Sequence, residues 1–189
     1  NIILVTTATD SFRSNVSTGT WAAAGSWESS SDGSNWITAT AAPTSAANTI
    51  TIRNGHNITL SSNVAVDQLV IENGGQLTVD QTTGVLNIND GSGFDIDIKS
   101  GGVLQVINSG TTFSYSQIVI FASNASMNVS GKVMVGNGSS TMGSGYGEFG
   151  FAAASQIIWN HNAILEWNTT GSVPATSGQT YFPGLSAAT

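Results

Sequence analysis

The chain has 189 residues, no cysteine and a formal net charge of −7, with four basic residues against eleven acidic ones. This composition excludes a disulfide-stapled scaffold, and the scarcity of Lys and Arg excludes a protein that binds nucleic-acid backbones. Ser, Thr, Gly and Asn make up 87 residues, yet 40% of the chain is hydrophobic, so it is not a disordered tail. We therefore expect one folded domain rich in turns and β-strands.

The N-terminal segment, residues 1–47, lacks the repeat that organises the later part of the chain. It carries three of the five tryptophans, Trp21, Trp27 and Trp36, and a predicted turn at Asp32-Gly33-Ser34-Asn35. A stack of repeats exposes an apolar core and unpaired strand edges at its end, so we interpret this segment as a cap. The three indoles are expected to form the core of the cap. The alternative is that they are exposed and stack on sugar rings.

From residue 48 onward, short apolar strands flank a turn in five copies of a degenerate repeat. The copies span residues 50–60, 69–79, 96–106, 119–129 and 157–167. Gly and Asn, which adopt a left-handed backbone at little cost, occupy one shared turn position: Gly55, Gly74, Gly101, Asn124 and Asn162. Large apolar residues follow at alternate positions with polar residues between them. This alternation predicts an inward apolar face and an outward polar ladder.

The repeat predicts an all-β fold and favours a parallel β-helix, a solenoid, with an N-terminal cap. Further short strands lie between the copies, and about twenty residues with three short strands make one coil of such a solenoid. The coils are expected over residues 48–170, with a glycine-rich loop at 136–150. Residues 171–189 are expected to be a last coil, a C-terminal cap or a linker. An antiparallel sandwich is the alternative, because it also contains strand–turn–strand units.

The densest acidic cluster consists of Asp90, Asp95 and Asp97, next to Gly91 and Gly93. Oxygen ligands at short spacing on a glycine loop are what Ca²⁺ binds. The spacing matches neither an EF-hand loop nor a glycine-rich calcium repeat, and the alternation predicts that Asp95 and Asp97 point to solvent from one strand. We therefore expect no calcium site and no other cofactor. With two histidines and no cysteine, we expect no zinc site either.

No motif in the chain indicates catalysis. Eleven carboxylates allow a pair for glycoside hydrolysis by number alone, but no local spacing selects one. The four cations Arg13, Arg53, Lys99 and Lys132 are scattered along the sequence. We therefore expect that the protein is not an enzyme. A polysaccharide-degrading enzyme is the remote alternative.

Several short blocks follow one another in a fixed order between residues 10 and 106. They are Asp10-Ser11-Phe12-Arg13-Ser14, Thr20-Trp21, Ser26-Trp27-Glu28, Trp36-Ile37-Thr38-Ala39-Thr40 with Pro43, Asn48-Thr49-Ile50-Thr51-Ile52-Arg53-Asn54-Gly55-His56 and Val64-Ala65-Val66-Asp67-Gln68-Leu69-Val70-Ile71-Glu72. In this order they resemble the N-terminal part of large secreted surface proteins of Bacteroidota. Such proteins are typically exported by the type IX secretion system and carry a C-terminal sorting domain. The resemblance implies a right-handed parallel β-helix and an adhesin-like role at the outer surface, with no catalytic residues in this segment.

These observations lead us to expect a non-catalytic, extracellular structural module, the stalk or base of a surface adhesin, joined to other domains of a larger protein. Without a recognisable sorting domain, the chain is expected to be an N-terminal fragment or a short member. Copies would stack end to end if the terminal coil is uncapped. The alternative is a carbohydrate-binding module that uses the cap tryptophans or the outward ladder. No apolar run approaches the roughly 18 to 20 residues that span a bilayer, so we expect no transmembrane segment.

Overall fold

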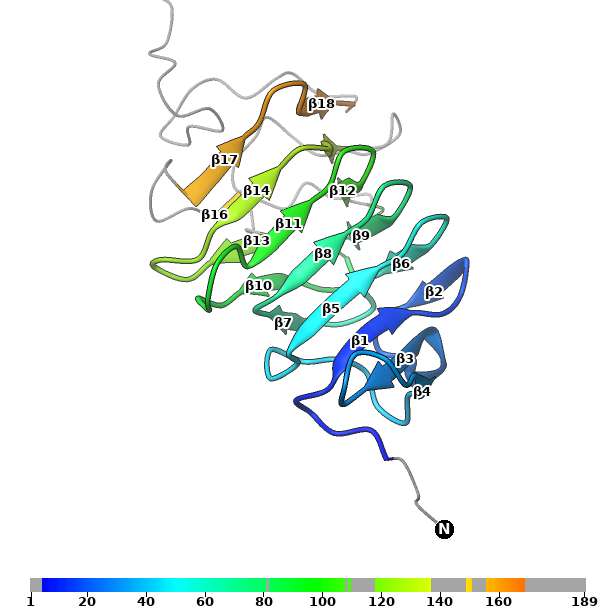
Figure 1. Ribbon diagram of the computed structural model, residues 1–189. Helices are drawn as coiled ribbons and strands as arrows, with labels where there is room; N and C mark the ends of the chain where they lie inside the picture. Colours follow the sequence, from blue (N-terminus) through cyan, green and yellow to red (C-terminus); the bar gives the residue numbers. More distant parts are fainter. Residues whose placement is uncertain are drawn as a thin grey trace, which may run out of the picture.

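The computed structural model describes residues 5–80, 82–107, 109, 118–136, 149–150 and 156–168. Within these ranges the regular structure is almost all β-strand, and helix is limited to 3-10 geometry at η1 (Ala24–Ser26) and at Gln156. The strands form three sheets, named here A, B and C, of eight, six and four strands (Figure 1). The prediction of an all-β fold is confirmed.

Each sheet is an ordered row of short strands. Sheet A contains, in spatial order, β17 (Ile157–Trp159), β14 (Met127–Val129), β11 (Ile96–Ile98), β8 (Leu69–Ile71), β5 (Thr49–Ile52), β1 (Ser11–Ser14), β3 (Trp27–Ser30) and β4 (Ile37–Thr38). Sheet B contains β18 (Ile164–Trp167), β15 (Lys132–Val135), β12 (Val103–Ile107), β9 (Gln76–Asp80), β6 (Asn57–Thr59) and β2 (Thr18–Thr20). Sheet C contains β16 (Phe149–Gly150), β13 (Val119–Phe121), β10 (Leu86–Ile88) and β7 (Val64–Val66).

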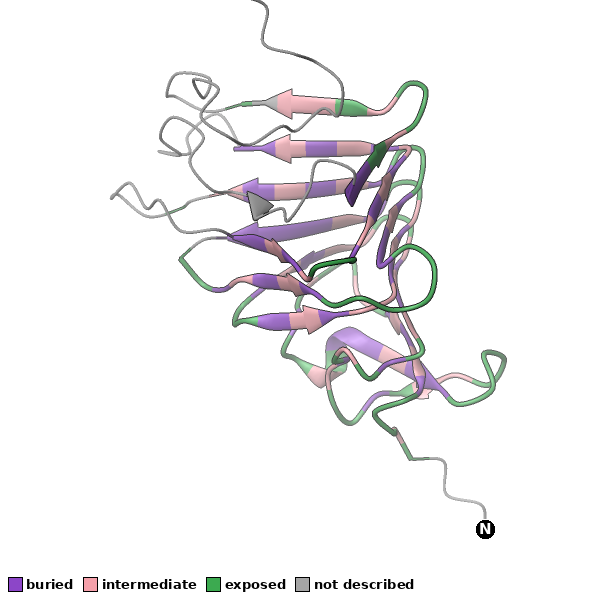
Figure 2. Cartoon of the chain, turned by 90° about the vertical axis from the view of Figure 1, so that its left-hand side faces the viewer, coloured by how far each residue is buried: buried purple, intermediate pink, exposed green. Residues whose placement is uncertain are grey.

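From β5 onward, hydrogen-bonded neighbours are three strands apart in the sequence, and all of these pairs are parallel. The chain therefore visits sheets A, B and C in turn. Each circuit, which we call a rung, lies beside the previous one, as the successive colours of Figure 1 and the side view of Figure 2 show. The antiparallel sandwich is thereby excluded, since only the β1–β3 and β3–β4 pairs among the described strands are antiparallel.

Alternate residues of the strands point into one core that the three sheets share. In sheet A an inward row runs in register through Phe12, Ile50, Leu69, Ile96, Met127 and Ile157. Sheets B and C add rows such as Ile58, Leu77, Leu104 and Val133, and Val66, Ile88 and Phe121. Branched aliphatic side chains pack well on a pleated surface, and each fully buried one contributes about 1.5–3 kcal/mol.

The turn between sheets A and B repeats in four rungs. Gly55, Gly74, Gly101 and Asn162 have φ of 75°, 77°, 81° and 67°, as the turn column predicts. In the first of these turns the His56 N–H donates to the Arg53 carbonyl at 3.1 Å. A left-handed residue at the third position of a four-residue turn is the geometry of a type II turn, which favours Gly or Asn.

The prediction for Asn124 is wrong. Residues 119–121 form β13 in sheet C, whereas Met127–Val129, as β14, pairs with β11 in sheet A. Asn124 therefore lies between sheets C and A, and it does not have a positive φ. The rung that begins with β14 turns instead through Ser130 and Gly131, two residues fewer than the other turns from sheet A to sheet B between β5 and β18. Because this turn is short, the copy predicted at residues 119–129 joined β13 to β14, whereas the equivalent pair of strands is β14 and β15.

Residues 1–47 do not form a separate cap throughout. β1 pairs in parallel with β5, and β2 pairs in parallel with β6, so residues 11–20 make a first rung. Only after β2 does the chain leave the parallel pattern, where β3 pairs antiparallel to β1 and β4 antiparallel to β3. Residues 171–189, and the glycine-rich loop apart from residues 136, 149 and 150, lie outside the described residues.

Candidate functional site

Two of the four cations lie close together on the outward face of sheet A, although they are far apart in the sequence. Arg13 on β1 pairs with Thr51 on β5, and Arg53 directly follows β5. On the other side of Arg13, β3 places Glu28 opposite it. These side chains and Trp36, which precedes β4, form what we call the Arg–Trp cluster: Arg13, Glu28, Trp36 and Arg53.

The Glu28 carboxylate lies between the two guanidinium groups of this cluster. Its Oε2 is 2.7 Å from Arg13 Nε and 3.9 Å from Arg53 Nη1. The Arg13 Cζ lies 4.1 Å from the ring centroid of the half-buried Trp36, which is a cation–π contact. Arg13 is therefore held from two sides, whereas Arg53 has one long contact and a side chain that is 41% exposed.

The sequence did not reveal this cluster, because the parallel partner of β1 was not recognised. Phe12-Arg13-Ser14 matches the alternation of Ile50-Thr51-Ile52 on β5. The match is hidden because the inward position after Arg13 holds Ser14, where later rungs have an aliphatic or aromatic residue. An alternation scan that accepts Ser at an inward position would have paired the two strands.

Beneath the cluster, Ser14 joins His56 to the backbone of Arg53. The Arg53 N–H donates to Ser14 Oγ at 2.9 Å, and Ser14 Oγ lies 2.8 Å from His56 Nδ1. Burial, and then the nearby Arg53 charge, lower the pKa of His56, so its ring is neutral at pH 7. Ser14 is fully buried, so this serine–histidine pair has a structural role and does not expose a nucleophile.

Trp21, Trp27 and Trp36 do not form the exposed sugar platform that was the alternative to a tryptophan core in the cap. Trp21 and Trp27 are 2% and 0% exposed, with ring centroids 4.9 Å apart in an edge-to-face arrangement. The Trp21 indole N–H donates to the Pro43 carbonyl at 3.0 Å, and that of Trp27 to the Trp21 carbonyl at 2.8 Å. These two are core residues, and only Trp36 keeps part of its ring accessible.

The acids Asp90, Asp95 and Asp97 do not converge. Asp95 is fully buried, which contradicts its predicted exposure, because its carboxylate accepts the backbone N–H groups of Gly91 at 2.7 Å and Ser126 at 2.6 Å. Asp97 pairs with Lys99 on the outer face of sheet A, while Asp90 accepts from the Asn124 amide. Within the described ranges, no three His, Asp or Glu side chains are placed to hold a metal ion.

The acid that contacts Asp95 is Asp67, which follows β7 and was not singled out from the sequence. Its Oδ1 is buried without a hydrogen-bond donor in the described structure, and it packs so closely on Gly91 that an added Cβ there would lie 1.8 Å away. Burial, and then the neighbouring Asp95 and Asp90, raise the pKa of Asp67. Asp67 therefore holds its proton to a higher pH than an ordinary aspartate.

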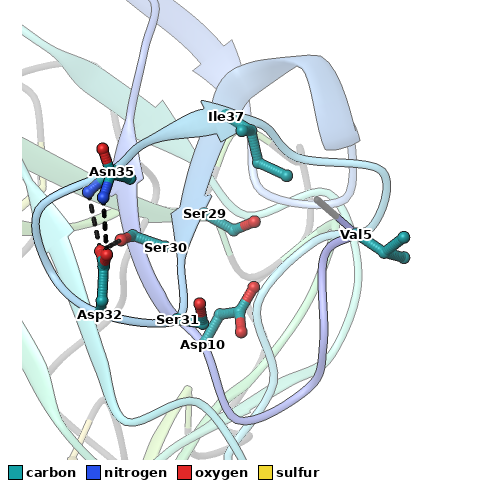
Figure 3. Close-up of a pocket in the computed structure, with 8 residues that line it drawn as sticks. All are labelled: Val5, Asp10, Ser29, Ser30, Ser31, Asp32, Asn35 and Ile37. Atoms are coloured by element: carbon teal, nitrogen blue, oxygen red, sulfur yellow. Dashed lines mark hydrogen bonds between the residues drawn. The ribbon is translucent and has the colours of Figure 1, made fainter. Parts of the chain in front are cut away.

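A small polar cavity of about 90 Å³ lies between Asp10 and Asp32 (Figure 3). Asp32 is turned toward Asn35 and accepts both its backbone and side-chain N–H groups, at 2.7 Å each. The backbone hydrogen bond from Asn35, above all, holds the pKa of Asp32 far below its usual range, and the turn predicted at residues 32–35 is confirmed. The cavity is well below the roughly 300 Å³ of small-molecule sites and has room for a few waters.

A wider groove of about 330 Å³ runs between the loop at Pro43 and the edge strand β7. It is lined by small, apolar or neutral polar side chains, including Ala22, Thr44, Val64 and Ala65. None of its described lining residues is ionisable, so the groove offers neither a general acid nor a general base.

The described part of the chain contains no helix with the length and apolar character to cross a membrane. No protein-family model matches the chain, no curated protein matches its sequence, and no solved structure matches it. The resemblance to secreted surface proteins of Bacteroidota therefore stays a prediction that rests on the residues themselves.

Proposed function

We propose that the chain is a right-handed parallel β-helix closed at its N-terminal end by β3 and β4, and that it is a non-catalytic structural module. It would form the stalk or base of an adhesin-like surface protein. The observation that carries this proposal is the in-register, parallel stacking of rungs around one core. In such a stack each rung contacts only its neighbours, so a stalk is lengthened by adding rungs.

A structural role is supported by the hydrogen bonds that the potentially reactive side chains already make. Ser14 is buried between the Arg53 backbone and His56. Asp95 binds backbone N–H groups, and Asp32 closes a turn. Each of these groups stabilises a local conformation, which leaves it poorly placed to take up a substrate.

The proposed location is the outer surface or the medium, after export by the type IX system, with other domains of the same polypeptide as partners. Two observations support this location. They are the ordered set of sequence blocks between residues 10 and 106 and the low number of charged side chains. With 15 charged residues in 189, the protein meets water mainly through hydroxyl and amide groups.

The carbohydrate-binding alternative is weakened in both of its predicted forms. The burial of Trp21 and Trp27 removes most of the aromatic platform. In the outward ladder of sheet B, Gln76 donates to Gln105 at 2.8 Å and to Thr78 at 3.0 Å, so these amides bond to one another. A sugar would have to break these bonds before it could use the groups.

The proposal is tested on cells that produce the full-length protein, by limited proteolysis of intact cells. Chymotrypsin suits this chain better than trypsin, because the chain has only four basic residues. The expected result is release of peptides from this chain together with peptides of further domains, and no release of reducing sugar from polysaccharides by the purified protein. Recovery only from lysed cells, or measurable sugar release, would overturn the proposal.

End-to-end stacking of copies is a separate prediction. Sheet A continues past β1 with the antiparallel β3 and β4, so at its N-terminal end this sheet does not offer the parallel register that a filament would need. We therefore expect sedimentation at rising concentration to show no open-ended polymer. Filaments in negative-stain images would support the stacking prediction instead.

A further inference from the structure

We propose that the Arg–Trp cluster is a binding site for the acidic groups of an anionic oligosaccharide, either the carboxylate of a uronate or a sulfate ester. The site is built by Arg13 and Arg53, with Trp36 and Glu28 as positioning residues. This inference is independent of the structural role, since a stalk can carry a binding site on its side.

The two guanidinium groups have hydrogen-bond donors to spare. In the described structure Arg13 donates a side-chain hydrogen bond only through Nε, to Glu28, so its terminal Nη groups are left for a ligand. Arg53 makes no side-chain hydrogen bond within the described ranges, and its nearest acid is 3.9 Å away. Planar forks of N–H donors match the two oxygens of a carboxylate or the oxygens of a sulfate.

The site is also organised before a ligand arrives. Arg13 rests on the Trp36 ring and is tied at Nε by Glu28, so little side-chain freedom remains to be lost on binding. Arg53 is fixed at its backbone by the hydrogen bond to the buried Ser14. Its side chain stays 41% exposed and can close onto a bound anion.

The local charge favours an anion even though the chain as a whole is acidic. The two arginines face one acid within 4 Å, Glu28, and His56 is neutral at pH 7 because its pKa is lowered. Glu72, the next acid along sheet A, accepts the Asn54 backbone N–H at 3.2 Å. Because the net charge of the chain is −7, the attraction for an anion is confined to this patch. Salt screens this attraction and weakens it.

The experiment is a calorimetric titration of the whole chain at low ionic strength with three probes of similar length: trigalacturonate, a κ-carrageenan-derived tetrasaccharide, which carries sulfate esters and no carboxylate, and the neutral sugar maltotriose. We expect binding of at least one acidic probe and none of maltotriose. Which acidic probe binds more tightly separates the carboxylate from the sulfate as the source of the recognised group.

The variants are Arg53→Gln and Lys132→Gln. The matched control Lys132 is also a partly exposed, ion-paired cation, but on sheet B. Arg53→Gln should weaken binding by about tenfold or more, because a charge-assisted pair is lost, while Lys132→Gln should leave it nearly unchanged. Trp36→Leu keeps every charge and should weaken binding by a smaller factor. Thermal melting shows that each variant is folded.

Two results would overturn the proposal. One is the absence of heat from both acidic probes at about millimolar concentration. The other is an equal loss of affinity in Arg53→Gln and Lys132→Gln, which would mean that the probes respond to overall charge and not to this site.

Discussion

The N-terminal end and the stack of rungs are both β-structure, but different kinds of contact hold them. From β5 to β18, the same few features recur: parallel pairs, inward aliphatic rows and a type II turn. From β1 to β4, the contacts are individual, such as the Trp21–Trp27 ring pair and the Arg13–Glu28 ion pair.

This difference indicates how the loss of one side chain affects the stability of each region. In the stack, the loss of one aliphatic side chain leaves the rows above and below in place. At the N-terminal end, Trp27 joins β3 to Trp21, the residue after β2, through a ring contact and an indole hydrogen bond. A repetitive region therefore spreads its stability over many rungs, while the end concentrates it in a few side chains.

The largest effect is expected for Trp27→Ala. The side chain is 0% exposed and its indole donates to the Trp21 carbonyl, so its removal should lower the free energy of unfolding by about 3–5 kcal/mol. Urea denaturation measures the loss, and hydrogen exchange locates it, with protection lost first in β1 to β4.

The control for this prediction is Leu104→Ala in β12, which is equally buried. Its cost should be about 2–5 kcal/mol, with the exchange centred on β9, β12 and β15. If both variants loosened the same strands, the contrast between the two regions would not hold.

A second prediction compares two glycines in equivalent turns. Gly55 and Gly101 both have a positive φ, but an added Cβ meets nothing within 4 Å at Gly55, whereas at Gly101 it would lie 2.3 Å from Asn73 Oδ1. Gly55→Ala should cost about 1–2 kcal/mol from the backbone alone. Gly101→Ala should cost about 1–3 kcal/mol more, because Asn73 must move.

The double variant Gly101→Ala with Asn73→Ala separates the two causes. Removing the amide should reduce the cost of Gly101→Ala to that of Gly55→Ala, as measured by thermal or urea unfolding. An unchanged cost would show that the contact between neighbouring rungs does not matter.

A third prediction concerns pH. Because the pKa of Asp67 is raised in the folded state, the folded protein binds this proton more tightly than the unfolded chain. The resulting stability is present below pH 3.8, the ordinary value, and is lost as the pH rises through the raised pKa. Asp67→Asn should remove this decline in unfolding curves recorded from pH 4 to 7.

The contribution of Asp80 to stability depends on pH in the opposite direction to that of Asp67. Burial works to raise its pKa, but hydrogen bonds from Ser109 and Thr82 outweigh it, and the pKa is lowered. Its contribution is present above pH 3.8 and is lost as the pH falls through the lowered pKa, so Asp80→Asn should alter stability at neutral pH and less in acid. The same pH slope in both variants would contradict these assignments.

The smallest effect is expected at the last described turn. Asn162 has a φ of 67°, which Asn tolerates better than Ala. Asn162→Ala should cost about 1 kcal/mol, whereas Asn162→Gly should change the free energy of unfolding by less than about 0.5 kcal/mol. Equal losses in the two variants would mean that the side chain, and not the backbone, sets this turn.

The parts of the fold that depend on local chemistry could be predicted from the sequence. A glycine in a four-residue turn and the alternation beside it are properties of a few neighbouring residues, and Gly55, Gly74 and Gly101 follow from them. Asn124 failed because its assignment needed to know which strand pairs with which. The shorter turn between β14 and β15 changes the spacing without changing the alternation.

The candidate site could not be predicted for the same reason. Arg13 and Arg53 meet only because β1 and β5 are neighbours, and Glu28 arrives through an antiparallel strand that breaks the repeat. Likewise, period-two alternation gives Asp95 an outward position, but its carboxylate is more stable inside, where two backbone N–H groups need an acceptor.

The constancy of the turn between sheets A and B decides where the protein can accept new sequence. That connection has two to four residues in every rung, whereas the connection from sheet B to sheet C grows from four residues after β6 to thirteen after β15. Most of the added length thus lies at this corner, since the connections from sheet C to sheet A have two to seven residues, and the strands of sheet A keep their register. An engineered peptide inserted after β9 or β12 should therefore be displayed without disturbing the surface that carries Arg13 and Arg53.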